Sequence, residues 1–263
     1  MAAKGIKNIE LSGGTEWYPE ICEDLIKLKK TEKLNFLLHN YFPPPIKNFV
    51  LNLASMNNEI HRISYDHIKN SLYLAAELSS TKFAIHAGFF IPISAAEIGK
   101  KISVSSIFDY KKSELRFWES YEELKVLAQS LGITLYIENN VISEENYKSF
   151  NQTVPFMLTG VEDYIKYINK DFSLLLDIAH LKVSSKTCGR SFKKECYELL
   201  TKTDYVHISD NDGLSDGNDP IIADSDLYRL LNNGILKNKS ITLEIYSEWD
   251  EIEKSKKIVE SLL

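Results

Sequence analysis

The sequence is poor in the features that mark secreted, membrane-spanning or nucleic-acid-binding proteins. It has three cysteines in 263 residues, Cys22, Cys188 and Cys196, and none belongs to a Cys-x-x-Cys pair. An odd number of unclustered cysteines favours reduced thiols in a cytoplasmic protein. No run of about 18 apolar residues occurs, and the first residues lack the apolar core of a signal peptide. We therefore expect no membrane-spanning segment and a cytoplasmic location.

Acidic residues outnumber basic ones, and arginine is scarce. The chain has 31 basic and 37 acidic residues, a net charge of −6, and no basic run stands out. Arginine, the side chain that binds phosphate in a bidentate manner, occurs only at four positions, which are Arg62, Arg116, Arg190 and Arg229. This composition favours a small-molecule substrate and makes a nucleic-acid partner unlikely.

Short apolar runs alternate with amphipathic stretches along the whole chain. Continuously apolar runs predict buried parallel strands, here at residues 9–11, 35–39, 83–86, 134–138, 173–177, 205–209 and 242–245. The stretches between them predict helices near residues 18–32, 64–79 (with Ser64 as N-cap), 108–131, 161–169, 192–202, 226–233 and 248–263. With no low-complexity segment or linker, residues 1–263 are predicted to form a single α/β domain of repeated β/α units.

The number of predicted strands falls one short of a closed barrel. A (β/α)8 TIM barrel has eight parallel strands, and the sequence supplies seven. Residues 155–159 are a candidate for the eighth, but their neighbours have the composition of a loop. Residues 2–6 resemble the end of a helix followed by its glycine turn. We therefore expect a TIM barrel that lacks the first strand and most of the first helix.

Six of the apolar runs end in a side chain that can bind a metal or move a proton. In a β/α barrel, the carboxyl ends of the strands form the active site. Four of these endings follow one another at intervals of one β/α unit, and three carboxylates with one imidazole suit Mn²⁺, Mg²⁺, Co²⁺ or Zn²⁺. A single such residue could equally cap a helix or pair with a lysine, whereas a set of four favours a metal site. The four are Glu138, Asp177, His207 and Glu244, and the other two endings are His39 and His86.

Five short strings resemble, in the same order, those of the xylose-isomerase-like TIM barrel superfamily. That superfamily includes sugar phosphate isomerases and epimerases and the endonuclease IV type of AP endonuclease. The resemblance covers nearly the whole chain. The strings are Ile85-His86-Ala87-Gly88, Tyr136-Ile137-Glu138-Asn139, Leu176-Asp177-Ile178-Ala179-His180, His207-Ile208-Ser209-Asp210 and Leu243-Glu244.

The resemblance implies a metal-dependent sugar or sugar-phosphate isomerase or epimerase. Glu138, Asp177, His207 and Glu244 would bind the metal. Glu138 and Glu244 would also be catalytic: one would remove a proton from the carbon next to the carbonyl, and the other would return a proton from the opposite face. The metal would stabilise the enediolate between these steps. The expected partner is a sugar or sugar phosphate, and a homo-oligomer stays open.

The endonuclease branch of the superfamily has further metal sites. By resemblance, His39 and His86 would bind a second metal or, alternatively, hydrogen-bond to sugar hydroxyls. His180 and Asp216 match ligands of a third zinc, but Asn218 stands where a histidine is needed, and asparagine is a poor zinc ligand. His180 would then contact substrate or orient Asp177. The missing histidine argues against a third zinc and hence against abasic-site cleavage. Abasic-site cleavage is thus the alternative function rather than the first choice, and non-catalytic sugar binding is another alternative.

Three basic residues follow the strand that ends at Asp177. Lys182, Lys186 and Arg190 are predicted to lie in the loop after this strand. They could contact a phosphate or carboxylate of the substrate, but a solvated surface loop is favoured over that role.

Overall fold

The computed structural model describes residues 4–263, in two compact units, Met1–Ile137 and Glu138–Leu263. Seven parallel strands, β1 to β7, occur in this part of the chain, and their order in the sheet is their order in the sequence. The predicted strand-and-helix alternation with seven strands is therefore confirmed. Of the segment predicted to resemble a helix end, Ala2 and Ala3 lie outside the described residues.

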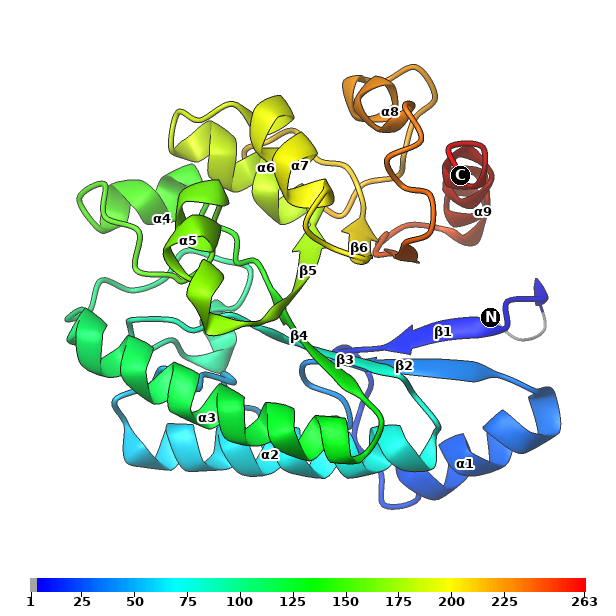
Figure 1. Ribbon diagram of the computed structural model, residues 1–263, viewed down its shortest axis with the longest axis horizontal. Coiled ribbons are helices and arrows are strands. Elements are labelled where there is room, and N and C mark those ends of the chain that lie inside the picture. The colour runs from blue at the N-terminus through cyan, green and yellow to red at the C-terminus, as the bar shows by residue number, and fades with distance from the viewer. Residues whose placement is uncertain (1–3) are drawn as a thin grey trace. The chain divides into compact units, whose positions relative to one another are not determined.

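The first unit carries the strands from β1 to β4, with the longest helices of the chain on the connections. Figure 1 shows α2 and α3 running side by side. On α3 the buried rings of Phe117, Trp118 and Tyr121 pack together, and the Tyr121 hydroxyl donates to the carbonyl of Leu135 in β4 at 3.0 Å. The elements are β1 (Asn8–Leu11), α1 (Ile21–Glu32), β2 (Asn35–His39), α2 (Asn58–Glu77), β3 (Lys82–His86), the 3-10 turn η2 (Ala95–Glu97), α3 (Tyr110–Ser130) and β4 (Thr134–Glu138).

The predicted start of α2 at Ser64 is wrong. The helix begins at Asn58, because the Asn57 side chain accepts hydrogen bonds from the backbone N–H groups of Glu59 and Ile60 and thereby caps the first turn. Ser64 lies buried inside the helix, where its hydroxyl donates to the Ile60 carbonyl at 2.6 Å. A serine hydroxyl can hydrogen-bond to a backbone carbonyl inside a helix as well as cap a helix, so the residue type alone does not locate the start of the helix.

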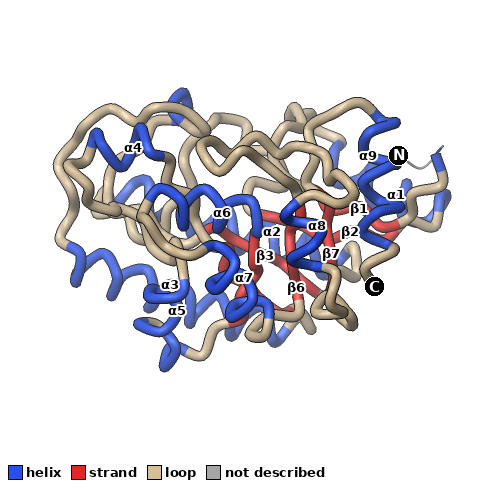
Figure 2. Tube along the Cα trace, turned by 90° about the horizontal axis from the view of Figure 1, so that it is seen from above, coloured by secondary structure: helices blue, strands red, loops and turns tan. Residues whose placement is uncertain are grey.

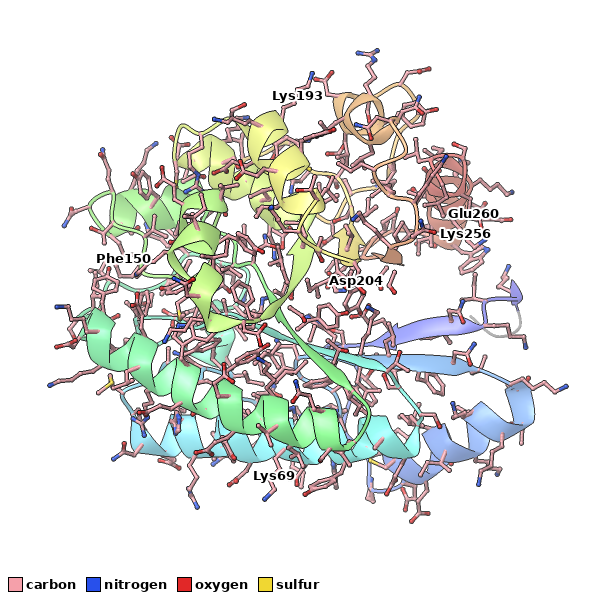
Figure 3. All side chains as sticks on the ribbon, viewed as in Figure 1. Lys69, Phe150, Lys193, Asp204, Lys256 and Glu260 are labelled. Carbon is pink, nitrogen blue, oxygen red and sulfur yellow. The ribbon has the colours of Figure 1, made fainter. Side chains whose placement is uncertain are left out.

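The second unit carries β5 to β7 and six helices within residues 138–263. Figure 2 draws its helices, such as α7 and α8, in blue and its strands, such as β6 and β7, in red. On α9, Lys256 and Glu260 form an exposed ion pair at 2.5 Å (Figure 3). No helix in residues 4–263 is both long and apolar enough to cross a membrane. The elements are α4 (Glu144–Ser149), α5 (Val161–Lys166), the 3-10 turn η3 (Ile168–Lys170), β5 (Ser173–Asp177), α6 (Ile178–Thr187), α7 (Phe192–Leu200), β6 (Tyr205–Ile208), α8 (Asp226–Leu231), β7 (Ser240–Leu243) and α9 (Trp249–Glu260).

Two predictions about the second unit are corrected. The segment after Asp177 is the helix α6 rather than a loop, so Lys182 and Lys186 are helical and only Arg190 follows the helix. The apolar run of β5 continues without a break into Ile178 and Ala179, and this continuity hid the start of the helix. Residues 155–159 form no strand and belong to the connection between α4 and α5.

Candidate metal centre

The four predicted ligands of the first metal stand at the ends of successive strands. Glu138 and Asp177 are the last residues of β4 and β5, His207 lies in β6, and Glu244 follows β7 directly. The prediction had placed Glu244 inside its strand. The register of β5 and β6 pairs Asp177 with His207, so their backbones are direct neighbours. Glu138, Asp177 and His207 are buried, whereas the Glu244 side chain is 23% exposed.

One ligand atom of each residue lies within 4.8 Å of one ligand atom of each of the other three. The His207 Nδ1 atom is 3.0 Å from Oε2 of Glu244, 3.6 Å from Oε1 of Glu138 and 4.0 Å from Oδ2 of Asp177. Ligand atoms that share one metal at roughly 2.1 Å are separated by roughly 3–3.5 Å. The four ligand atoms lie only slightly farther apart than this, so the side chains could hold one metal ion, as the strand-end pattern predicts.

The Asp177 carboxylate tests whether these residues fit a cation. Its Oδ1 accepts from the backbone N–H of His180 at 2.7 Å, whereas Oδ2 is buried and accepts no hydrogen bond within residues 4–263. Burial raises the pKa of Asp177 to about 7; His180 opposes this increase, and Glu138 and Glu244 reinforce it. A buried anionic oxygen without a partner is costly, and a divalent cation would remove that cost. Three carboxylates and one imidazole thus fit a divalent metal.

Asn139, to which we had assigned no role, holds the end of β5 in place. Its side-chain NH₂ donates to the Asp177 carbonyl at 3.0 Å, and its side-chain oxygen accepts from the Asp177 N–H at 2.7 Å. This double hydrogen bond joins Asn139, the residue after β4, to Asp177, the last residue of β5. In the sequence, Asn139 is recognisable only as an amide next to Glu138, because its partner Asp177 lies 38 residues further along the chain.

His180 has contacts at both ring nitrogens. Its Nδ1 donates to the Asn139 carbonyl at 2.9 Å, and its Nε2 lies 3.1 Å from Oδ2 of Asp216. Burial lowers the pKa of His180, but the carboxylates of Asp177 and Asp216 outweigh burial and raise this pKa well above its usual value. Both ring nitrogens thus have oxygen partners within the protein, the Asn139 carbonyl at Nδ1 and the Asp216 carboxylate at Nε2.

Asn218 and Tyr246 complete the rim of the centre. The Asn218 side-chain oxygen accepts from the Ser209 hydroxyl at 3.0 Å. Tyr246 is 73% exposed, and its hydroxyl donates to Oε1 of Glu244 at 3.2 Å. We had not singled out Tyr246. Its spacing from Glu244 was the available signal, because residues two apart in an extended segment share one face.

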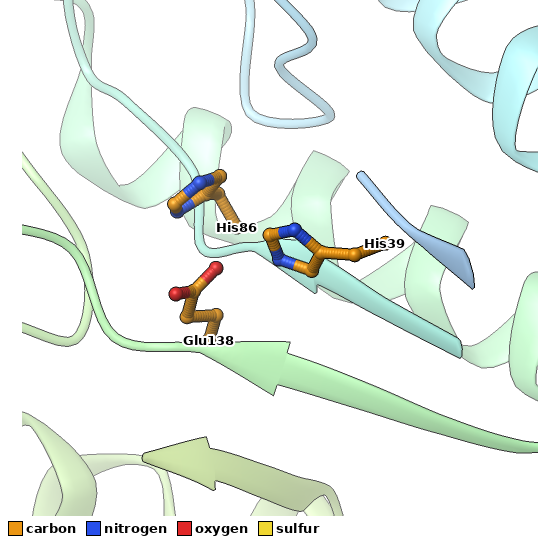
Figure 4. Close-up of side chains that lie close together, drawn as sticks. All are labelled: His39, His86 and Glu138. Carbon is orange, nitrogen blue, oxygen red and sulfur yellow. The ribbon is translucent and has the colours of Figure 1, made fainter. Parts of the chain in front are cut away.

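The two further histidines belong to the first unit. His39 and His86 are the last residues of β2 and β3 (Figure 4), and their rings meet edge to face with centroids 5.5 Å apart. The Ser12 hydroxyl is 3.1 Å from Nδ1 of His39. Their role as second-metal ligands or sugar contacts stays a prediction.

The three basic residues after β5 hydrogen-bond to other parts of the protein, whereas the sequence predicts them in a solvated loop. Lys182 donates to Oδ1 of Asp210 at 2.5 Å, and Lys186 donates to the Asp212 carbonyl at 3.0 Å. Both lysines thereby fasten the segment after β6 to α6. Arg190 donates to the Thr159 carbonyl at 2.8 Å.

Comparisons with known proteins agree with this architecture. The crystal structure of a D-tagatose 3-epimerase-like protein is similar with a TM-score of 0.69 and 18% identity, covering 97% of this chain and 88% of that chain. D-allulose 3-epimerase from Methylomonas sp. is similar with a TM-score of 0.67 and 13% identity, covering 100% of this chain and 89% of that chain. At these identities the similarity shows the TIM-barrel fold alone.

Similarity is also found at the level of sequence. The uncharacterized protein MJ1311 of Methanocaldococcus jannaschii is 24% identical over 198 residues, which are 75% of this chain and 59% of that protein. This chain thus spans less than two thirds of the length of that relative. A family model described as Xylose isomerase-like TIM barrel matches residues 1–261. The chain therefore belongs to the xylose isomerase-like TIM barrel family.

Proposed function

We propose that this protein is a divalent-metal-dependent sugar or sugar-phosphate isomerase or epimerase. The observation that carries the proposal is the convergence of Glu138, Asp177, His207 and Glu244 ligand atoms at the strand ends. Similarity in fold to sugar epimerases supports the choice of substrate class.

These four side chains would hold the cation. When bound, the cation supplies positive charge beside the oxyanion that develops when a ketose loses the proton next to its carbonyl. Such a carbon acid is weak, so the reaction also needs a positioned base.

The two glutamates would move the protons. One carboxylate takes the proton from the carbon beside the carbonyl, leaving the electron pair in the enediolate. The other, as a carboxylic acid, returns a proton to that carbon from the opposite face and inverts it. Glu138 is buried and Glu244 is partly exposed, so Glu244 is the group that re-equilibrates with solvent.

Exchange in deuterated water tests the proposal. The Mn²⁺-loaded protein should incorporate deuterium at the carbon beside the carbonyl of a ketose or ketose phosphate. Glu138→Gln should lower the rate by about 10²-fold or more. Glu253→Gln, an exposed glutamate on α9 outside the cluster, is the matched control and should exchange like the unchanged protein.

Two results would count against the proposal. One is the lack of exchange with every ketose and ketose phosphate in a protein shown to hold the metal. The other is cleavage of an abasic-site duplex that disappears in Glu138→Gln, which would replace the proposal with the endonuclease function.

A further inference from the structure

The two carboxylate oxygens of Glu244 have different partners. Oε2 lies 3.0 Å from Nδ1 of His207, on the side of the ligand cluster. Oε1 accepts a hydrogen bond from the Tyr246 hydroxyl at 3.2 Å. Each oxygen of the carboxylate therefore has a partner of its own, and Oε2 is the oxygen next to His207.

Glu244 is the ligand most in need of such a restraint. The side chains of Glu138 and Asp177 are 1% exposed and that of Glu244 is 23% exposed. Close packing limits the rotamers of the buried carboxylates, whereas a partly exposed glutamate has freedom to leave the cluster. A hydrogen bond to Oε1 removes part of that freedom without occupying Oε2.

Tyr246 is in turn fixed through its backbone. Its N–H donates to the Asn218 carbonyl at 3.0 Å. Asn218 is buried and has a φ of 50°, in the left-handed region that asparagine adopts more readily than most residues. Its side chain accepts from the Ser209 hydroxyl, which anchors the turn. Asn218 thus has a structural reason to be asparagine.

We propose that Tyr246, held by the Asn218 carbonyl, is a positioning residue that orients the Glu244 carboxylate toward the metal and the substrate carbon. The inference rests on the proposed function in so far as Glu244 is a ligand and a proton-transfer group. The phenol acts through Glu244 and needs no contact with the reacting atoms.

Mn²⁺ titration of the folded protein tests the positioning role by metal affinity, so no activity assay is needed. Tyr246→Phe keeps the ring and removes only the hydroxyl, and it should weaken Mn²⁺ binding about tenfold. Tyr197→Phe is the matched control, because Tyr197 is an exposed tyrosine of α7 whose hydroxyl makes no hydrogen bond in the part of the chain that the structure describes. Equal Mn²⁺ affinity in Tyr246→Phe and the unchanged protein overturns the inference.

A kinetic readout separates positioning from packing. At saturating Mn²⁺, Tyr246→Phe should lower kcat about tenfold and leave the KM for the ketose unchanged. A raised KM with an unchanged kcat would assign Tyr246 to sugar binding and overturn the positioning role.

A double-mutant cycle on the metal-free protein keeps this inference distinct from the proposed function. If the hydrogen bond exists, Tyr246→Phe and Glu244→Ala should be non-additive, by about fivefold in the unfolding equilibrium constant. Additive effects overturn the Tyr246–Glu244 link. Coupling in a protein that binds no Mn²⁺ supports the link and overturns the proposed function instead.

Discussion

Asp177 and His180 are joined by the hydrogen bond that begins α6. Oδ1 of Asp177 accepts the His180 N–H at 2.7 Å and caps the helix, while Oδ2 of the same carboxylate stays buried and accepts no hydrogen bond from residues 4–263. One oxygen therefore caps α6, and the other makes no hydrogen bond. Burying Oδ2 without a hydrogen bond costs the protein stability when no cation is bound.

Asp177→Asn should stabilise the metal-free protein at neutral pH. Asparagine keeps the helix cap and removes a carboxyl whose pKa is raised from 3.8 to about 7. Between these values the native state binds more protons than the unfolded state, so stability falls as pH rises. We expect urea unfolding at about pH 8 to show a gain of about 2 kcal/mol, with a smaller pH dependence from about pH 4 to 7. A variant less stable than the unchanged protein at that pH would contradict the cost assigned to Oδ2.

Divalent metal should stabilise the unchanged protein and not Asp177→Asn. A ligand that binds only the native state raises its stability, by about 2.7 kcal/mol at 100 times its Kd. Thermal unfolding with Mn²⁺, and again after EDTA, measures this shift. An equal shift in the two proteins would place the bound metal outside the Glu138–Asp177–His207–Glu244 cluster.

His67 should make the protein less stable in mild acid. Its ring packs edge to face on Phe49, and burial lowers the His67 pKa, although a hydrogen bond with the Asn40 backbone opposes this. The unfolded state therefore takes up a proton at a higher pH than the native state, and stability falls as pH drops below about 6.5. His67→Gln should flatten urea-unfolding stability between about pH 7 and 5.

The control for His67 lies on the same helix. Lys69 is exposed on α2 (Figure 3), so Lys69→Gln should leave the pH dependence in this range unchanged. The same slope in His67→Gln and the unchanged protein would show that this imidazole does not control acid stability.

Gly160→Ala should destabilise the second unit. A Cβ at Gly160 would lie 2.8 Å from Nη2 of Arg190 and 3.0 Å from Oε1 of Glu195, two side chains that form an ion pair at 3.2 Å. The φ of Gly160 is 177°, so the cost comes from the collision and not from the backbone. We expect a loss of about 1–3 kcal/mol in urea unfolding. Gly13→Ala, with no atom within 4 Å of the added Cβ, should change stability by about 0.5 kcal/mol or less; a similar loss at both sites would rule out the collision.

Local pattern was sufficient for the strands and for the four candidate ligands. Buried parallel strands are continuously apolar, and a β/α barrel carries its active site at the carboxyl ends of its strands, so Glu138, Asp177, His207 and Glu244 could be named as candidate ligands in advance. Helix boundaries are harder to predict from the sequence than strands. Ser64 is of a type that caps helices, but Asn57 provides the cap of α2. The first turn of α6 continues the apolar run of β5, and this continuity hides the start of the helix in the sequence.

The amino-acid sequence by itself determined the strand-and-helix alternation, the family and the residue types at the strand ends, because these depend on periodicity and on neighbours along the chain. Only the tertiary structure decided which other side chains hold the strand-end residues in place. Asn139 clamps Asp177 across 38 residues, and Asn218 holds Tyr246, which in turn holds Glu244. Hydrogen bonds act over about 3 Å in space whatever the separation along the chain, so a linear pattern contains no record of these partners.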